Sequence, residues 1–259
     1  MGTSTSNYGQ NGKTPLVPSW LEDDDNQQTI PPQADPERFR IPRNNFTRYI
    51  NSGGKNTGYL RRAASNYIQK SIGGSRNATV RLGSARTSTA RIVSVLNGIS
   101  KNGVEEAGIR FQLGDLIGKN AKDFFIDLID FVCPDGGVTD EGIARSSYIE
   151  AIEDIPELAT KNIEDLNDNE LLVFVETYMT NVVQERLIND IGNKLISLPD
   201  DVNSVELLQS QMKDFIFGAV SDSIANLNVE IRDIESDNVS SIVDEMYEQA
   251  YSILASLED

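Results

Sequence analysis

The most reactive group that this sequence offers is a backbone amine at its N-terminus. A small residue follows Met1, so we expect the initiator methionine to be removed and the amine of Gly2 to be exposed. Glycine has no Cβ to shield that nitrogen. The pKa of an α-amine lies near 7.7 to 8.0, which leaves a neutral, nucleophilic fraction near neutral pH. Gly2 is therefore a candidate for covalent modification inside another protein's active site.

Side-chain chemistry is restricted by composition. Histidine is absent and Cys133 is the single cysteine, which excludes Ser-His-Asp and Cys-His catalysis, the usual zinc sites and an intramolecular disulfide. No pair of carboxylates has a spacing that singles it out for acid and base catalysis. We therefore expect no catalytic residue, no metal site and no cofactor, and we predict that the chain is not an enzyme.

One stretch resembles a calcium loop. Asp165, Asn167, Asn169 and Glu176 occupy the first, third, fifth and twelfth positions of that pattern, but the sixth position is Glu170 where the sharp turn needs glycine. Asn167 followed three residues later by Glu170 is also a capping box. The spacing favours a helix start over a metal site.

Residues 1–35 are rich in Ser, Thr, Asn, Gln, Gly and Pro and poor in apolar side chains. We expect this tail to be disordered, because it buries too little apolar surface to offset the entropy of ordering. Even so, it gathers Leu16, Val17, Trp20 and Leu21 within six residues. Exposed apolar groups gain nothing unless a partner covers them, so this segment is a predicted docking site.

Charge is divided unevenly along the chain. Residues 1–35 carry one Lys and five acids, residues 36–101 carry thirteen Lys or Arg and one acid, and residues 102–259 carry nine Lys or Arg and thirty-four acids. The basic block either faces the acidic block within the fold or binds an anionic partner. The candidate anion-binding residues are Arg61, Arg62, Arg76, Arg81, Arg86 and Arg91.

The apolar spacing of residues 36–259 has a helical period, which predicts an all-α body of about seven or eight helices. The strongest pattern, about 168 to 197, must be buried along one stripe. Its expected companions cover 36–51, 57–72, 84–100, about 119 to 132, a segment capped by Thr139, about 203 to 227 and about 239 to 257. No stretch is long and apolar enough to span a bilayer and no secretory signal is evident, so we expect a cytoplasmic protein with no membrane partner.

The tail resembles the N-terminus of the QatB family, a component of the four-protein Qat antiphage defence system. The resemblance rests on 1–9 (MGTSTSNYG), 12–18 (GKTPLVP) and 19–21 (SWL). It implies a bacterial protein that acts beside an ATPase, a QueC-like enzyme and a TatD-like nuclease. QueC-like enzymes activate a deazaguanine carboxylate with ATP, so the resemblance implies that such a partner captures the tail and modifies Gly2.

Under that hypothesis the tail residues that contact the partner are Thr3, Ser4, Tyr8, Pro15, Leu16, Val17, Pro18, Trp20 and Leu21. The prolines limit the entropy lost on binding. A competing hypothesis is a helical adaptor that binds nucleic acid or defence partners through its basic 36–101 block, with the tail serving only as a tether.

Overall fold

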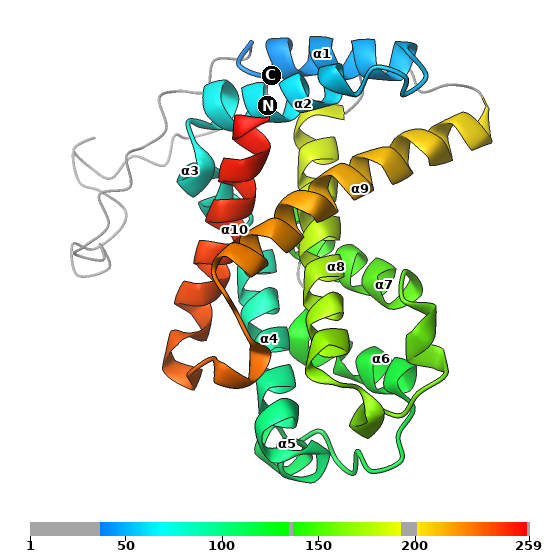
Figure 1. The fold of residues 1–259 in the computed structure, drawn as a ribbon, viewed down its shortest axis with the longest axis vertical. Helices are drawn as coiled ribbons and strands as arrows, with labels where there is room; N and C mark the ends of the chain where they lie inside the picture. Colours follow the sequence, from blue (N-terminus) through cyan, green and yellow to red (C-terminus); the bar gives the residue numbers. More distant parts are fainter. Residues whose placement is uncertain (1–36, 135–136, 193–200, 258–259) are drawn as a thin grey trace, which may run out of the picture. The chain divides into compact units, whose positions relative to one another are not determined.

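The computed structural model describes residues 37–134, 137–192 and 201–257, and these residues fold as an all-α body (Figure 1). The described part contains ten α-helices, with short π-helical and 3-10 turns between them, and the expected fold class is confirmed. No helix in these ranges combines the length and the apolar character needed to cross a membrane.

The α-helices are α1 (Arg40–Asn51), α2 (Thr57–Asn66), α3 (Ser75–Val80), α4 (Ser84–Asn102), α5 (Val104–Arg110), α6 (Ala121–Val132), α7 (Thr139–Glu153), α8 (Asp168–Leu187), α9 (Val202–Asn226) and α10 (Val239–Ser256). Two π-helical turns, η2 (Tyr67–Ile72) and η5 (Ile188–Gly192), continue α2 and α8.

The eight segments expected to be helical all contain a helix, and the two further helices, α3 and α5, are short. Six or seven residues span fewer than two turns, too few for an apolar period to be visible in the sequence. One expected cap is wrong: Thr139 is the first residue of α7, and the cap position is Val138. The carboxylate of Glu141 accepts the backbone N–H of Val138 at 3.2 Å.

The start of α8 confirms the capping box. The side-chain oxygen of Asn167 accepts the backbone N–H groups of Asn169 and Glu170 at 3.0 and 3.1 Å. In return, the carboxylate of Glu170 accepts the backbone N–H of Asn167 at 3.0 Å. Asn167 therefore satisfies two of the N–H groups that have no partner within the helix.

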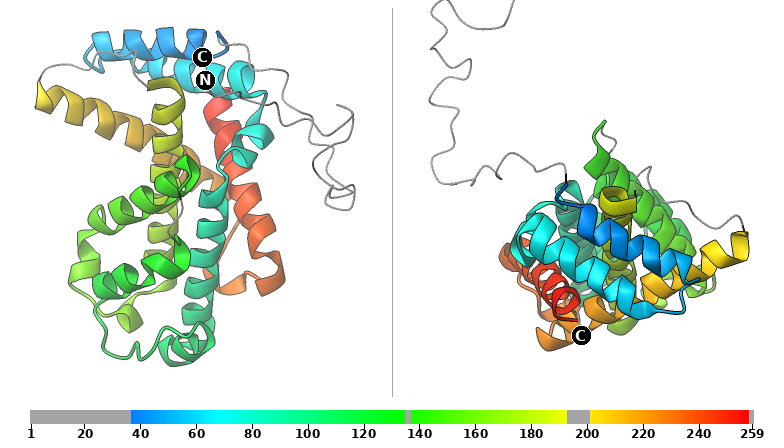
Figure 2. Two further views of the ribbon diagram at one scale, coloured as in Figure 1. Left: turned by 180° about the vertical axis from the view of Figure 1, so that it is seen from behind. Right: turned by 90° about the horizontal axis from the view of Figure 1, so that it is seen from above.

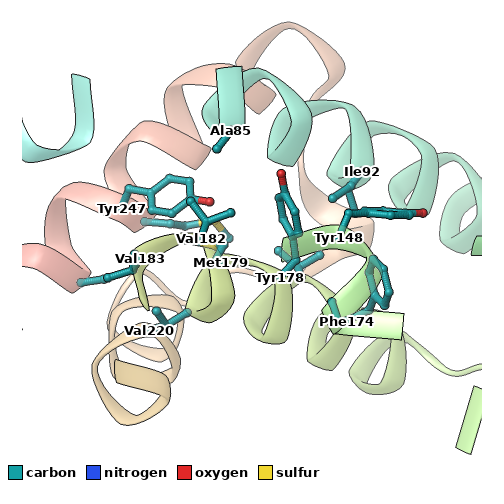
Figure 3. Close-up of a cluster of buried hydrophobic side chains, with 14 of the residues drawn as sticks. Ala85, Ile92, Tyr148, Phe174, Tyr178, Met179, Val182, Val183, Val220 and Tyr247 are labelled. Carbon is teal, nitrogen blue, oxygen red and sulfur yellow. The ribbon is translucent and has the colours of Figure 1, made fainter. Parts of the chain in front are cut away.

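Helix α8 lies at the centre of the body and packs against α4, α7 and α9. Its predicted stripe is buried: Val175, Tyr178, Met179 and Val182 are each 0% exposed. Figure 3 shows Tyr178, Met179 and Val182 of this stripe between the flanking helices. The ring of Phe174 on the same helix stacks on Phe125, with centroids 3.8 Å apart. This stripe contributes to a single apolar core that side chains from all the longer helices share, and burial of such surface favours folding.

Helices α1 and α2 lie side by side and form one layer with η2 (Figure 2). Polar contacts join the layer to α9 and α10. Ser65 Oγ and Gln69 Nε2 donate to the carbonyl of Ala255, near the end of α10, at 2.8 and 2.9 Å. Tyr49 Oη donates to the carbonyl of Leu208 on α9 at 3.1 Å. Ser65 and Gln69 thus donate to a carbonyl in the last turn of α10, where a helix end leaves carbonyls without partners.

The turn between α3 and α4 requires a glycine. Gly83 has φ +54°, and a Cβ at this position would lie 2.4 Å from Oδ2 of Asp140 on α7. Because no side chain fits there, the backbone approaches the start of α7 directly. Asp140 in turn accepts a hydrogen bond from Nη1 of Arg186 at 2.5 Å.

Candidate functional site

The tail residues named above as modification or docking candidates lie outside the described residues. They are Gly2, Thr3, Ser4, Tyr8, Pro15, Leu16, Val17, Pro18, Trp20 and Leu21. The candidate anion-binding arginines all lie within the described part, so the surface built by the basic block is the site that the structure defines.

Arg81 is engaged by the acidic part of the chain. Its Nε and Nη2 donate to the two carboxylate oxygens of Asp190 at 2.7 and 3.0 Å. Tyr67 Oη donates to the same carboxylate at 2.8 Å, and Nε of Arg186 lies 3.6 Å from it. One buried carboxylate in η5 therefore holds groups from η2, the end of α3 and α8.

Asp190 is 8% exposed. Burial raises the pKa of this carboxyl, but the hydrogen bonds from Arg81 and Tyr67, together with the nearby guanidinium charges, bring the pKa below its ordinary value. The same burial, with the negative charge of Asp190, raises the pKa of Tyr67. Asp190 therefore stays ionised and Tyr67 stays neutral at neutral pH, as expected of a structural ion pair.

Arg86 and Arg91 on α4 also contact the acidic part. The guanidinium of Arg86 binds both carboxylate oxygens of Asp244 on α10, with Nε at 2.6 Å. Nη1 of Arg91 lies 3.4 Å from the carbonyls of Phe131 and Val132 at the C-terminal end of α6. Arg81 and Arg86 therefore pair with carboxylates, and Arg91 lies against the end of a helix. For these three arginines the basic block contacts the acidic part of the same fold and not an anionic partner.

Arg61, Arg62 and Arg76 are different, because all three are exposed. Arg61 and Arg62 lie on α2 and Arg76 lies on α3. The regular five-residue spacing from Arg76 to Arg91 does not form one stripe, since it runs from α3 through a turn into α4. The structure therefore divides the six candidates into three engaged and three exposed arginines.

The exposed arginines of α2 adjoin a cation on α1. The guanidinium carbons of Arg48 and Arg62 lie 5.9 and 5.6 Å from the ring centroid of Tyr59. Tyr59 is half-buried at the junction of the two helices, whereas Tyr67 is 1% exposed and donates to Asp190. We name Arg48, Tyr59, Arg61 and Arg62 the α1–α2 cationic face.

The charged residues of α1, α2, η2 and α3 are almost all positive. Between residues 37 and 80 the sequence has nine Lys or Arg and a single acid, Glu37. Glu37 lies 3.7 Å from Nη1 of Arg40, outside the cationic face. Among the described residues, no carboxylate forms an ion pair with Arg48, Arg61 or Arg62. The positive charge of the face is therefore not neutralised within the described body.

Two surface hollows lie in other parts of the body. The first, about 650 Å³, lies where the end of α4 meets the start of α8 and is lined by Ser100, Asp168 and Arg232 among others. Ser100 Oγ donates to the Asp168 carboxylate at 2.6 Å. The second, about 620 Å³, lies beside α6, and its mixed lining includes Phe111, Leu128 and Phe131 together with Lys119 and Asp127.

The described residues contain no cluster of three or more His, Cys, Asp or Glu side chains that would hold a metal ion. Cys133 is 2% exposed, and burial raises the pKa of its thiol. The thiol donates to the carbonyl of Ala144 at 3.5 Å. This cysteine is a packed interior side chain.

Sequence reasoning identified the basic block but missed two of the residues that organise it. Arg48 was not among the candidates, because on α1 it is one cation among several and only contact with Tyr59 of the next helix distinguishes it. Asp190 gave no signal either, since it is one of thirty-four acids in residues 102–259. Its partner Arg81 lies 109 positions away in the sequence.

The fold and this surface define an all-α, charge-segregated protein in which residues 36–101 carry mainly positive charges and residues 102–259 carry mainly negative charges. A family model described as "Qat anti-phage system associated protein QatB" matches residues 73–254. This match covers more than half of the chain, so the chain belongs to the QatB family and is a component of the Qat anti-phage system. No curated protein and no solved structure matches it.

The family match and the tail resemblance rest on different residues. The resemblance uses positions up to residue 21, whereas the match begins at residue 73. The expected family is therefore confirmed by an independent part of the sequence. The matched range also begins after α1, α2 and η2, so the α1–α2 cationic face lies outside it.

Proposed function

We propose that this chain is a non-enzymatic, cytoplasmic component of the Qat system whose N-terminal tail is the substrate of a QueC-like partner enzyme. The observation that carries the proposal is the sequence of the tail in a chain of the QatB family. Gly2 supplies an unhindered amine, and the segment from Leu16 to Leu21 supplies apolar anchors that a partner would cover.

The proposed reaction joins the tail to a deazaguanine. The partner first activates the deazaguanine carboxylate with ATP, which gives an acyl-adenylate and releases pyrophosphate. The Gly2 nitrogen then attacks the acyl carbon, a C–N bond forms, the bond between that carbon and the phosphate oxygen breaks, and AMP leaves. The amine gives up a proton in this step, and the product is an amide at the N-terminus.

The residues at the start of the described body are packed firmly enough to anchor such a tail. Phe39, at the entry to α1, stacks on Tyr67 with ring centroids 6.1 Å apart. The guanidinium carbons of Arg38 and Arg43 lie 4.6 and 5.4 Å from the centroid of Phe39. A chain extends by at most about 3.3–3.6 Å per residue, so a tail of this length has a reach on the order of 100 Å. In this proposal that reach takes Gly2 into the partner's active site.

The intact mass of the protein, purified from cells that carry its native operon, tests the proposal. We expect a mass increase that matches the deazaguanine acyl group and localises to the N-terminal peptide. Gly2→Pro should abolish the increase, because proline offers only a hindered secondary amine. Thr5→Ala, which leaves the amine and the docking residues unchanged, should retain it. An unmodified N-terminus in the presence of an active QueC-like partner would overturn the proposal.

A second candidate function is an adaptor that binds nucleic acid or other Qat components, including the ATPase or the TatD-like nuclease, through the basic 36–101 block. The observation that favours it is the exposure of Arg61, Arg62 and Arg76. Engagement of Arg81 and Arg86 by carboxylates narrows the candidate surface to the α1–α2 layer and α3.

A further inference from the structure

We propose that the α1–α2 cationic face binds single-stranded nucleic acid. The inference rests on the second candidate function and narrows it to one surface and one class of ligand. It is independent of the proposed modification of Gly2, which concerns the tail.

The first argument is that the guanidinium groups are held in place without being neutralised. The guanidinium carbons of Arg48 on α1 and Arg62 on α2 both lie within cation–π distance of the centroid of the Tyr59 ring. An ion pair would order an arginine and also cancel its charge, but an aromatic ring orders it and leaves the charge. Two like charges thus converge from neighbouring helices and present hydrogen-bond donors to an incoming anion.

The residues around Arg62 also leave its guanidinium accessible to an anion. Arg61 adjoins Arg62 on the exposed side of α2. Oδ1 of Asn56 and Nη2 of Arg62 lie 3.1 and 3.9 Å from the position that a Cβ on Gly58 would occupy, so a larger residue at this position would crowd both side chains. The exposed guanidinium of Arg62 keeps the fork geometry that matches two phosphate oxygens.

The second argument selects nucleic acid over an acidic peptide. A nucleic-acid strand carries one charge per phosphate and a base with a π-face, and base–aromatic stacking contributes about 1–3 kcal/mol per base. The Tyr59 ring is already covered by Arg48 and Arg62, but the exposed planar guanidinium groups of Arg61 and Arg62 provide surfaces on which bases stack. An acidic peptide would use the charges of these arginines but has no base to place against the guanidinium planes.

The net charge of the chain is −17, which repels polyanions at long range. Screening limits that repulsion, because the Debye length is about 8 Å at physiological ionic strength. Helix α1 alone, with twelve residues, spans about 18 Å. Within one Debye length, a strand bound on the layer therefore meets mainly the cations of the layer. At physiological salt these cations determine whether the strand binds.

The test is a fluorescence titration of the full chain with a short labelled single-stranded DNA at several salt concentrations. We expect binding that weakens steeply with salt. The double variant Arg48→Gln/Arg62→Gln should bind at least about tenfold more weakly, and its logarithmic salt slope should fall by about 1.4, which corresponds to two lost phosphate contacts on a single strand. Tyr59→Leu should weaken binding, whereas Tyr59→Phe, which keeps the ring, should restore it.

Arg110→Gln is the matched control. Arg110 is also an exposed arginine beside an aromatic ring, 5.1 Å from the centroid of Phe111, but it lies on α5, away from the cationic face. This variant removes one positive charge, one cation–π contact and a hydrogen bond from Nη2 of Arg110 to Oγ of Ser236 at 3.3 Å, and we expect its affinity for the strand to match that of the wild type. Thermal unfolding of each variant confirms that the fold is retained, since exposed arginines contribute little to stability.

Three results would overturn the inference. The first is wild-type protein that does not bind the strand, and the second is a double variant that binds as tightly as the Arg110→Gln control. The third is displacement of the strand by polyglutamate or by inorganic phosphate alone at matched charge concentration, which would assign the face to an acidic protein or to a free anion. The N-terminal mass of the double variant separates this inference from the tail proposal, because an unchanged modification shows that Gly2 chemistry survives loss of the face.

Discussion

Tyr67 donates a hydrogen bond of 2.8 Å to Asp190, and this bond joins the two π-helical turns of the described body, η2 and η5. The two residues are 123 positions apart. Through this contact the basic layer of α1, α2 and η2 is fixed to the end of the central helix α8. The residue that anchors the cationic layer is therefore itself an acid.

Removal of that charge should destabilise the protein strongly. Asp190→Asn leaves Arg81 and the buried Arg186 without their shared carboxylate, and loss of one partner from a buried pair costs about 3–5 kcal/mol. Urea unfolding measures the change. Asp237→Asn, at an exposed position, is the control and should unfold like the wild type. Equal stability of the two variants would show that the pair has no structural role.

The stability of the protein should carry a pH signature from a buried acid on α8. Burial raises the pKa of Glu176, an effect that a hydrogen bond with Ser221 partly offsets. The folded state then holds the proton more tightly than the unfolded state, so this residue lowers the free energy of unfolding as the pH rises from the unfolded pKa through the raised folded pKa.

Glu176→Gln removes the titrating carboxyl and with it this pH-dependent loss of stability. We therefore expect the variant to gain stability relative to the wild type as the pH rises from acid to neutral, and denaturant unfolding at several pH values measures the difference. Glu245→Gln, at an exposed position on α10, is the control for loss of one carboxylate. A pH-independent difference for Glu176→Gln would contradict the raised pKa.

The capping box of α8 should contribute measurably to stability. Asn167→Ala removes the acceptor for two backbone N–H groups, and loss of such a cap costs about 1 kcal/mol. Asn169→Ala keeps its backbone N–H and should have a much smaller effect. Chemical denaturation of the two variants side by side checks this, and identical midpoints would rule out the cap as a stabilising element.

Truncation of the buried aromatic side chain Phe174 on α8 should lower the stability of the protein strongly. Phe174 is fully buried between Phe125 and Tyr148, with ring centroids 3.8 and 5.5 Å away. Phe174→Ala leaves a cavity and should cost about 3–5 kcal/mol, seen as a lower unfolding midpoint. The neighbouring Val173 is 40% exposed, so Val173→Ala should cost far less. Similar losses at both positions would contradict the packing described.

The tail proposal makes a separate prediction about capture by the QueC-like partner. Trp20→Ala should weaken the complex by a few kcal/mol at most, because Trp20 is one of several apolar anchors. Gln27→Ala, a polar change in the same tail, should leave affinity unchanged. Calorimetric titration of the purified partner with each protein makes the comparison, and equal affinities would remove Trp20 from the docking segment.

The sequence by itself determined the fold class, the buried stripe of α8 and the cap at Asn167, because each of these depends on residues within a few turns of one another. It also determined that the chain is charge-segregated, since that is a property of composition along the chain. The short helices α3 and α5 and the π-helical turns escaped prediction, because too few residues define them for a period to be visible.

Only the tertiary structure decided which positive charges are neutralised. Arg81 and Arg62 are equivalent in the sequence, yet Arg81 meets Asp190 from a segment 109 positions away, whereas Arg62 meets the ring of Tyr59 and Arg48 of the neighbouring helix. An ion pair depends on which helix ends pack together, and that packing is set by apolar burial across the whole body. The order of charged residues along the sequence does not show which helix ends pack together.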